Sequence, residues 1–157
     1  MLTVSRASYE SPIGWLEVSA VERGVQGIRF TEHPGEPAGV GNEHLSCCLE
    51  QLAAYFAGKE HAFSRFSLAM LGTEFQQRVW DAALEIPFGR KRTYAELAEQ
   101  LGGRKYARAV ARALGANPLL LIIPCHRVIA SSGDIGGFSA GVWRKEWLLK
   151  FESAKQP

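Results

Sequence analysis

Residues 117–128 read Asn-Pro-Leu-Leu-Leu-Ile-Ile-Pro-Cys-His-Arg-Val, and the fold is expected to be organised around this stretch. Its five apolar residues, 119–123, lie between two prolines. Such a run is too short for a membrane span and is typical of a buried strand. Because Pro124 has no amide hydrogen to donate to a sheet, the strand is predicted to end there and the chain to turn, which places Cys125 at the end of a rigid element.

Two basic side chains, His126 and Arg127, follow Cys125 directly. Positive neighbours lower the pKa of a thiol, and the thiolate is the nucleophilic form. A lone cysteine in a soluble protein is more often a buried structural residue, and the local sequence leaves that alternative open. The adjacent imidazole and guanidinium groups favour a reactive cysteine.

The composition is that of an ordinary soluble globular protein. Of 157 residues, 46% are hydrophobic and 22% are charged, which is enough for one domain or two small ones. No apolar run approaches membrane length, and the N-terminus lacks the pattern of a secretory signal. The three cysteines, of which Cys47 and Cys48 are adjacent, do not indicate a disulfide framework, so the expected compartment is the reducing cytoplasm.

No metal site is predicted from the histidines and cysteines. A structural zinc site requires characteristic ligand spacings, which are missing here, so core or surface roles are favoured for these side chains. The side chains considered are His33, His44, Cys47, Cys48 and His61.

The charge is distributed unevenly along the chain. Residues 1–70 carry five basic and eight acidic side chains, a net −3, whereas residues 71–157 carry thirteen and eight, a net +5. A basic C-terminal half is where a polyanion would bind. We place a domain boundary near residue 71, between an N-terminal support domain (1–70) and a C-terminal domain (71–157).

The N-terminal half is predicted to contain a small sheet and one helix. Two or three strands are expected within residues 2–30, followed by a surface loop at 31–41. Residues 42–58 have a helical apolar pattern that ends at Gly58. Another short apolar alternation covers 63–71.

The C-terminal half is predicted to be mainly helical. Helices are expected at 73–86 and 93–101, each opened by a capping box, and at 142–152. A further helix at 105–114 follows the Gly-Gly turn at 102–103, as in a helix-turn-helix. The predicted fold class is therefore α+β, with a winged-helix-like C-terminal domain.

The helix at 105–114 has an arginine face. Arg104, Arg108 and Arg112 recur every fourth residue and should share one exposed side. A solvated charged face is the alternative interpretation, although the alanine-rich surface would let the helix sit deep in a DNA groove. The predicted inner face consists of Ala107, Val110, Ala111 and Leu114.

Several segments, in this order and spacing, resemble the O6-alkylguanine-DNA alkyltransferase family. The resemblance covers residues 71–152, whereas the N-terminal half matches only in outline. The resemblance is carried by residues 123–128 with Asn117 and Pro118 upstream, by the segments 72–80, 93–94, 107–110 and 144–149, and by Glu152.

The resemblance implies a suicide enzyme that moves an alkyl group from O6 of guanine in duplex DNA to its own cysteine, without a cofactor. Activity on O4-alkylthymine is a weaker expectation. By resemblance, Cys125 is the acceptor, His126 deprotonates it through a water, and Glu152 orients the imidazole. Tyr94 would hydrogen-bond the purine and Asn117 would brace the turn. This is a nucleophile, base and orienting-group arrangement used for a single turnover.

The target base must be extruded from the duplex to be reached. The resemblance implies that Arg108 fills the gap it leaves. The expected DNA contacts are Thr93, Tyr94, Ala107, Arg108, Ala111, Arg112, Ala113 and Arg127, and the expected pocket residues are Val128, Phe138, Ser139, Ala140 and Lys145.

This sequence departs from the family pattern at two pocket positions. Ala140 stands where the family usually has glycine, and Phe138 where tyrosine is common. Both bear on how bulky an alkyl group is accepted.

Three other functions compete with alkyl transfer. A non-catalytic lesion-recognition protein would have replaced the acceptor, which Cys125 argues against. A helix-turn-helix regulator usually dimerises, and the absence of an obvious dimerisation element predicts a monomer here. A Cys-His hydrolase needs an oxyanion hole that the sequence does not indicate.

Overall fold

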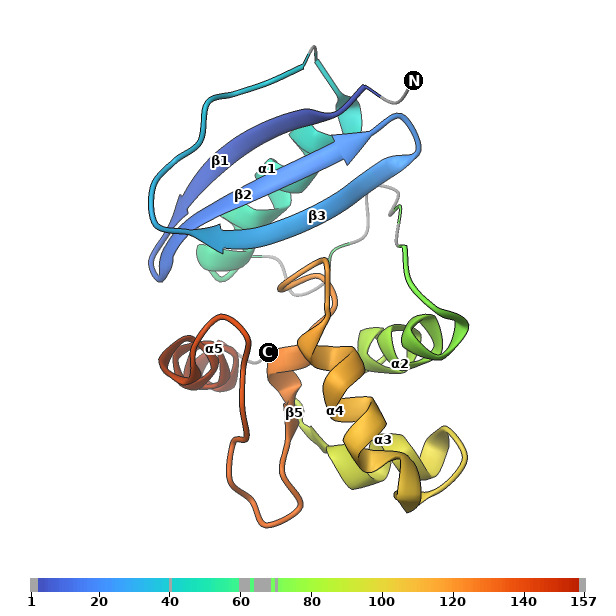
Figure 1. The fold of residues 1–157 in the computed structure, drawn as a ribbon. Helices are drawn as coiled ribbons and strands as arrows, with labels where there is room; N and C mark the ends of the chain where they lie inside the picture. The colour runs from blue at the N-terminus through green and yellow to red at the C-terminus, as the bar shows by residue number, and fades with distance from the viewer. Residues whose placement is uncertain (1–2, 40, 60–62, 64–68, 70, 156–157) are drawn as a thin grey trace. The chain divides into compact units, whose positions relative to one another are not determined.

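The computed structural model describes residues 3–39, 41–59, 63, 69 and 71–155. The chain divides into two compact units, Met1–Leu71 and Gly72–Pro157. The first combines a sheet with a helix and the second is mainly helical (Figure 1), which confirms the predicted α+β class. In the described part of the chain, no helix has the length and apolar character needed to cross a membrane.

The first unit contains an antiparallel sheet. Its strands are β1 (Ser5–Ser11), β2 (Gly14–Val21) and β3 (Gly24–Thr31), paired in the order β1-β2-β3. Residues Leu16, Val18 and Ala20 alternate along β2 and are fully buried, as expected for a strand with one face on a core. The short connections at 12–13 and 22–23 make two hairpins, as the turn residues predict.

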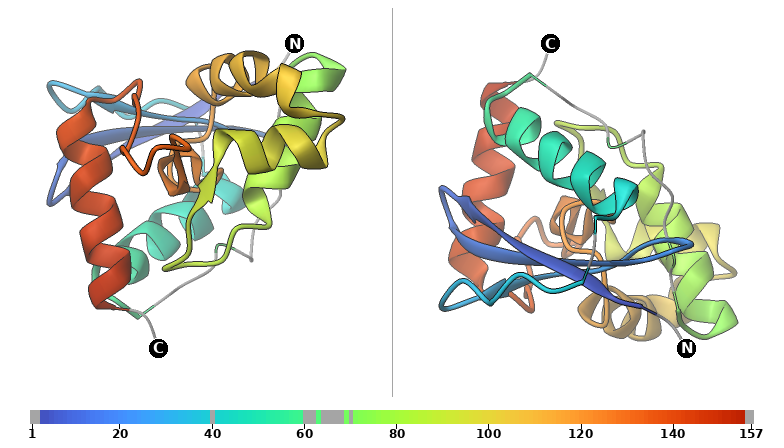
Figure 2. Two further views of the ribbon diagram at one scale, coloured as in Figure 1. Left: turned by 90° about the horizontal axis from the view of Figure 1, so that it is seen from below. Right: turned by 90° about the horizontal axis from the view of Figure 1, so that it is seen from above.

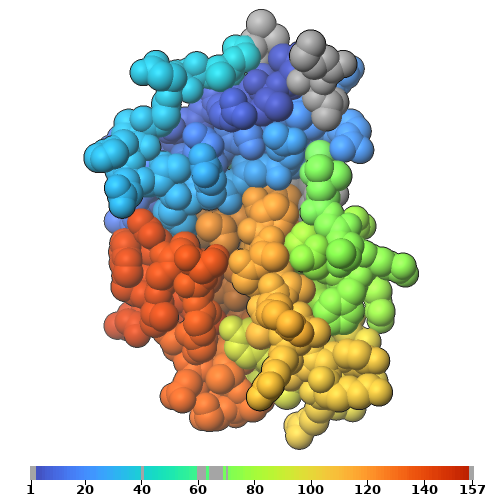
Figure 3. All heavy atoms as spheres, in the orientation of Figure 1, coloured from blue at the N-terminus to red at the C-terminus, as the bar shows by residue number. Residues whose placement is uncertain are grey.

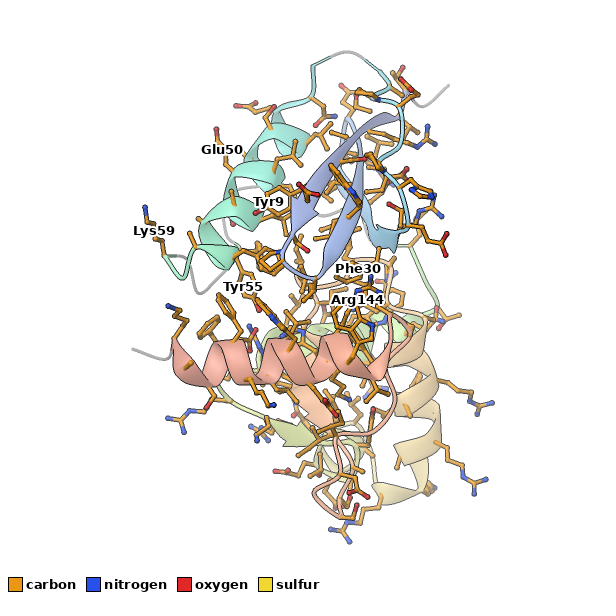
Figure 4. All side chains as sticks on the ribbon, turned by 90° about the vertical axis from the view of Figure 1, so that its left-hand side faces the viewer. Tyr9, Phe30, Glu50, Tyr55, Lys59 and Arg144 are labelled. Carbon is orange, nitrogen blue, oxygen red and sulfur yellow. The ribbon has the colours of Figure 1, made fainter. Side chains whose placement is uncertain are left out.

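One helix, α1 (Glu43–Phe56), covers one face of this sheet (Figures 1 and 2). Asn42 caps it by accepting a hydrogen bond from the Leu45 amide, and Gly58 ends it with a φ of 76°. Tyr9 and Tyr55 lie between sheet and helix, whereas Glu50 and Lys59 point away (Figure 4).

The cysteines and histidines of this unit do not form a metal centre in the described residues. Cys48 is completely buried on the core side of α1, where burial raises the pKa of its thiol to about 12. His44 lies near the Glu22 carbonyl oxygen, 3.2 Å away. His61 and most of the alternation predicted at 63–71 lie outside the described residues.

The second unit begins with two capped helices. Helix α2 (Glu74–Leu84) opens at Thr73 and α3 (Tyr94–Gln100) at Thr93, and each has the predicted capping box. Two-residue strands, β4 (Arg92–Thr93) and β5 (Val128–Ile129), pair in parallel. This pairing holds the start of α3 beside the turn that carries Cys125.

The helix-turn-helix consists of α3 and α4 (Ala107–Gly115), joined by a 3-10 turn, η1 (Arg104–Tyr106). Gly102 and Gly103 have φ values of 136° and 146°, which only glycine adopts without strain. The last helix, α5 (Val142–Ala154), follows a long loop.

The predicted phase of α4 is wrong at two positions. Ala111 was placed on the inner face but is exposed, whereas Ala113 is buried with an exposed fraction of 4%. The α-helix begins only at Ala107, after the 3-10 turn, so the buried side consists of Val110, Ala113 and Leu114. Positions 110, 113 and 114 have the same i, i+3, i+4 spacing as the predicted stripe, so helical periodicity does not choose between alanines on neighbouring faces.

The predicted strand at 119–123 is also wrong. These residues are buried as expected, but they form a compact turn in which the Ile123 amide donates to the Leu119 carbonyl at 2.9 Å. Leu121 has a φ of 77°. The Asn117 side chain binds both ends of the turn, through the Leu119 amide and the Ile123 carbonyl, each at 2.8 Å, which replaces the pairing a neighbouring strand would supply.

Trp80 connects α2 to α4. Its indole is buried, and its Nε1 donates a hydrogen bond of 2.8 Å to the carbonyl oxygen of Ala113. A Cβ added to Gly72 would lie 2.5 Å from the Trp80 ring, so the start of the unit packs closely on the same indole.

We expect Trp80→Phe to lower the free energy of unfolding by about 1–3 kcal/mol, because it removes the donor to a buried carbonyl. Urea unfolding followed by circular dichroism measures the change. Trp143→Phe is the matched control, since that indole is exposed and should be replaceable at little cost. Equal unfolding midpoints for the two variants would contradict this account.

Candidate active site

Cys125 opens a 3-10 turn, η2 (Cys125–Arg127), immediately after the buried turn at 119–123. Its thiol is almost completely buried, with 5% of the residue exposed. The Nδ2 of Asn117 donates to Sγ at 3.1 Å and to the Ile123 carbonyl at 2.8 Å. One amide group therefore holds both the turn and the sulfur it presents.

Behind the cysteine, the carboxylate of Glu152 binds two side chains of the same turn. Its Oε2 lies 2.7 Å from Nε2 of His126, and both its oxygens accept hydrogen bonds from Arg127, at 2.7 and 2.9 Å. Arg127 also donates to the Ile86 carbonyl at 2.7 Å. All three charged or chargeable groups are buried.

The electrostatics of this cluster determine the state of His126. Burial opposes ionisation of Glu152, but His126 and Arg127 more than offset it, so the carboxyl pKa lies well below its usual range. Burial lowers the pKa of His126 despite the attraction of Glu152, so the imidazole is neutral near neutral pH. An ionised carboxylate only accepts hydrogen bonds, which assigns the ring proton to Nε2.

The second ring nitrogen of His126 is left as an acceptor. Nδ1 is buried and has no hydrogen-bond partner among the described residues. A neutral imidazole whose Nε2–H is held by a carboxylate can take a proton at Nδ1. The arrangement therefore has the chemistry of a general base next to a thiol in sequence.

The expectation that His126 and Arg127 lower the pKa of the thiol is wrong. Burial raises the pKa of Cys125 to about 11, and the hydrogen bond from Asn117 and the charge of Lys145 only partly oppose this. Arg127 directs its charge to Glu152 instead. Residues that are neighbours in sequence need not face each other in a 3-10 turn. The position of Arg127 next to Cys125 in the sequence therefore did not predict which group its charge acts on.

The positive group that acts on the thiol is Lys145, the fourth residue of α5. It is fully buried, and its Nζ donates to the carbonyls of Val128 at 2.6 Å and Gly137 at 3.1 Å. The Tyr94 hydroxyl lies 3.5 Å from the same nitrogen. Burial lowers the pKa of Lys145 to about 8, and the thiol of Cys125 acts in the opposite direction.

A pocket of about 360 Å³ opens onto Cys125. Figure 3 shows a hollow on this face between α4 and the segment that leads into α5. Gly136, directly before the lining residue Gly137, has a φ of 77°, and a Cβ there would lie 3.1 Å from the Tyr94 hydroxyl, so this position favours glycine. The pocket is lined by Tyr94, Ala111, Leu114, Gly115, Cys125, Gly137, Phe138 and Ser139.

Some predicted pocket residues line this cavity and others support it. Phe138 and Ser139 are in the lining, whereas Val128 and Lys145 are buried and joined to each other by a hydrogen bond. Ala140 accepts a hydrogen bond from Arg144 at 2.8 Å. The wall supplied by Leu114 and Gly115 was missed, because sequence periodicity placed that part of α4 in the core or at its end.

The predicted DNA contacts divide in the same way. Arg108, Ala111 and Arg112 are exposed on α4 and are available to a ligand. Thr93 caps α3, and Ala107 is half-buried. Ala113 and Arg127 are not exposed in this structure, because Ala113 packs in the core and Arg127 is buried in its ion pair with Glu152.

Comparison with known proteins identifies the family. Residues 74–154 match the family model described as 6-O-methylguanine DNA methyltransferase, DNA binding domain, and residues 4–70 match its ribonuclease-like domain. The chain belongs to the 6-O-methylguanine DNA methyltransferase family. The resemblance seen in the sequence is thereby confirmed, and it extends to the N-terminal half.

Relatives in this family are similar over nearly the whole chain. A methylated-DNA–protein-cysteine methyltransferase of Mycobacterium leprae is 43% identical, over 92% of this chain and 90% of the relative. The crystal structure of the Mycobacterium tuberculosis O6-methylguanine methyltransferase superposes with a TM-score of 0.86 at 40% identity, covering 98% of this chain and 95% of that one. The Mycobacterium tuberculosis protein in complex with DNA superposes with a TM-score of 0.83 at 39% identity, covering 96% and 93%.

We expect Glu152→Gln to lower the free energy of unfolding at neutral pH by about 3–5 kcal/mol, because Arg127 is left buried without its counter-charge. The depressed pKa of Glu152 stabilises the native state fully above about 4.3, the ordinary pKa of a glutamate. This contribution is lost as the pH falls, so the difference between the two proteins should shrink in acid. Urea unfolding across a pH series measures it.

The control for this variant is Glu146→Gln, on the exposed side of the same helix. It should unfold like the unmodified protein at every pH. A Glu152→Gln protein as stable as this control would show that the buried cluster contributes nothing net to stability.

Proposed function

We propose that this protein repairs alkylated DNA by direct reversal, moving the alkyl group from O6 of guanine to Sγ of Cys125. The observation that supports the choice of acceptor is the position of the three cysteines. Cys125 lies in the wall of the pocket, whereas Cys48 lies in the core of the first unit. Cys47 is a half-buried neighbour of Cys48 on α1.

The proposed reaction begins with removal of the thiol proton. Because the pKa of Cys125 is about 11, only a small part of the protein carries a thiolate at rest. His126 accepts the proton at Nδ1, through a water, and Glu152 stabilises the resulting imidazolium. Lys145 and the amide of Asn117 stabilise the thiolate as it forms.

The sulfur then displaces guanine from the alkyl carbon. A carbon–sulfur bond forms as the bond from the alkyl carbon to O6 breaks, and guanine leaves as an anion. The anion takes up the proton that His126 removed from the thiol, so no proton is gained or lost overall. Tyr94, which lines the same pocket as Cys125, hydrogen-bonds the purine and helps neutralise this charge. A thioether is a poor leaving group, so each chain acts once and no cofactor takes part.

Double-stranded DNA is the partner of this reaction. The exposed arginines of α4 suit phosphate contacts and groove entry, and Arg108 is proposed to fill the stack after the target base is extruded. We further propose that the protein acts as a monomer, in the cytoplasm, on alkylated guanine in duplex DNA.

A single methyl group should be found on Cys125 after incubation with a duplex that carries one O6-methylguanine. Intact-protein and peptide mass spectrometry should show the gain of one methylene mass, with saturation at one group per chain. Cys125→Ser should gain none while still binding the duplex. Tight lesion binding without any mass gain in the unmodified protein would instead indicate a lesion-recognition protein.

Lys145→Met should slow methyl transfer at neutral pH by about tenfold, the effect of a one-unit rise in the thiol pKa. Removal of the ammonium group removes an attraction that favours the thiolate, so the rate–pH profile should move to higher pH. Single-turnover rates across a pH series measure both. Lys150→Met, on the exposed side of α5, is the control and should leave the profile unchanged.

A further inference from the structure

Trp143, the second residue of α5, places a large aromatic side chain in water. It is 55% exposed, and Val142 before it is 45% exposed. The indole Nε1–H of Trp143 has no hydrogen-bond partner among the residues that the structure describes. An exposed tryptophan therefore combines an apolar face with an unused donor, a combination that is common at binding surfaces.

This indole is held in place by the loop that lines the pocket. A Cβ added to Gly141 would lie 3.3 Å from the Trp143 ring, so the ring rests against the end of that loop. The guanidinium of Arg144 lies 4.6 Å from the ring centroid and donates to the Ala140 carbonyl at 2.8 Å. Contacts on both sides reduce the conformational entropy the ring would lose on binding.

The indole is also continuous with the pocket wall. The Gly141 amide donates to the Phe138 carbonyl at 2.9 Å, which closes a turn, and Phe138 and Ser139 of that turn line the pocket. The start of α5 and helix α4 lie on either side of the hollow in Figure 3, and Figure 2 shows them at the same end of this unit.

We propose that Trp143 packs against the DNA strand that carries the target nucleotide, on the side of the pocket opposite α4. The inference rests on the proposed function. Extrusion of a base leaves neighbouring bases and deoxyriboses with exposed apolar faces, and an aromatic ring is the side chain that stacks on them without regard to sequence. The free Nε1–H can donate to a phosphate or base oxygen of the same strand.

The basic surroundings agree with this partner. The guanidinium of Arg144 lies over the Trp143 ring, and the first turn of α5 carries no acidic residue. An acidic polymer with apolar faces fits this surface better than a neutral protein surface would. In this arrangement the arginines of α4 contact one side of the lesion, and Trp143 contacts the other.

The test compares Trp143→Ala and Trp143→Phe in a Cys125→Ser background, which prevents covalent capture. Fluorescence anisotropy with a duplex carrying one O6-methylguanine gives the dissociation constants. The Trp143→Ala variant should bind about tenfold more weakly, because it loses one stacking contact. The Trp143→Phe variant should retain most of the affinity. Leu84→Ala, another exposed apolar residue of this unit, is the matched control and should bind normally.

Salt dependence distinguishes stacking from charge. Trp143→Ala should weaken binding equally at all salt concentrations, because stacking releases no counterions. Arg112→Ala, which removes an exposed arginine of α4 suited to a phosphate contact, should instead reduce the slope of log affinity against log salt by about one unit.

Transfer from the free base O6-methylguanine to Cys125, in otherwise unmodified protein, completes the test. Trp143→Ala should react with the free base at the normal rate, because the pocket and the reacting groups are intact. Normal DNA binding by Trp143→Ala would overturn the proposal. A loss of free-base transfer by Trp143→Ala as large as its loss of DNA binding would also overturn it, because Trp143 would then only support the loop. So would a variant that differs from the unmodified protein only in self-association, measured by sedimentation.

Failure of the proposed function would look different. In that case the unmodified protein would transfer no methyl group from either substrate, whatever residue stands at 143. The affinity comparison would still decide whether Trp143 contacts DNA.

Discussion

The buried carboxylate of Glu152 is the interaction on which the second unit depends. It joins the last helix to the 3-10 turn that carries Cys125, through His126 and Arg127, and Arg127 extends the connection to the end of α2. A charge in such a place must be compensated fully, because an unpaired ion in the interior is costly. The same compensation holds the imidazole in one tautomer, so the requirements of stability and of proton transfer coincide in one cluster.

The thiol is kept in a different electrostatic environment from this cluster. Burial keeps Cys125 protonated at rest, and Asn117 and Lys145 supply stabilisation that favours the charged sulfur. A cysteine used only once benefits from this arrangement, because a permanently exposed thiolate would react with other electrophiles. The buried sulfur and the mainly apolar pocket therefore favour reaction with a substrate whose alkyl carbon is held against Sγ of Cys125.

The local signals in the sequence predicted most of the elements but not the central turn. Both capping boxes and the glycines at 102–103 placed α2, α3 and the helix-turn-helix correctly, since these patterns depend on residues within one turn of each other. The stretch 119–123 was assigned to a strand because buried strands and buried turns have the same composition. Only the Asn117 side chain, which binds both ends, distinguishes them.

The sequence by itself determined the family, the two-part α+β organisation and the identities of the cysteine, histidine and glutamate, because these follow from motifs and their order. The tertiary structure decided which groups act on one another. Arg127 binds Glu152, and Ala113 faces the core. Lys145 acts on the thiol of Cys125 from a helix that begins fourteen residues after Val128. Charge and burial act through space, and their effect on a pKa depends on distances that adjacency in the chain does not specify.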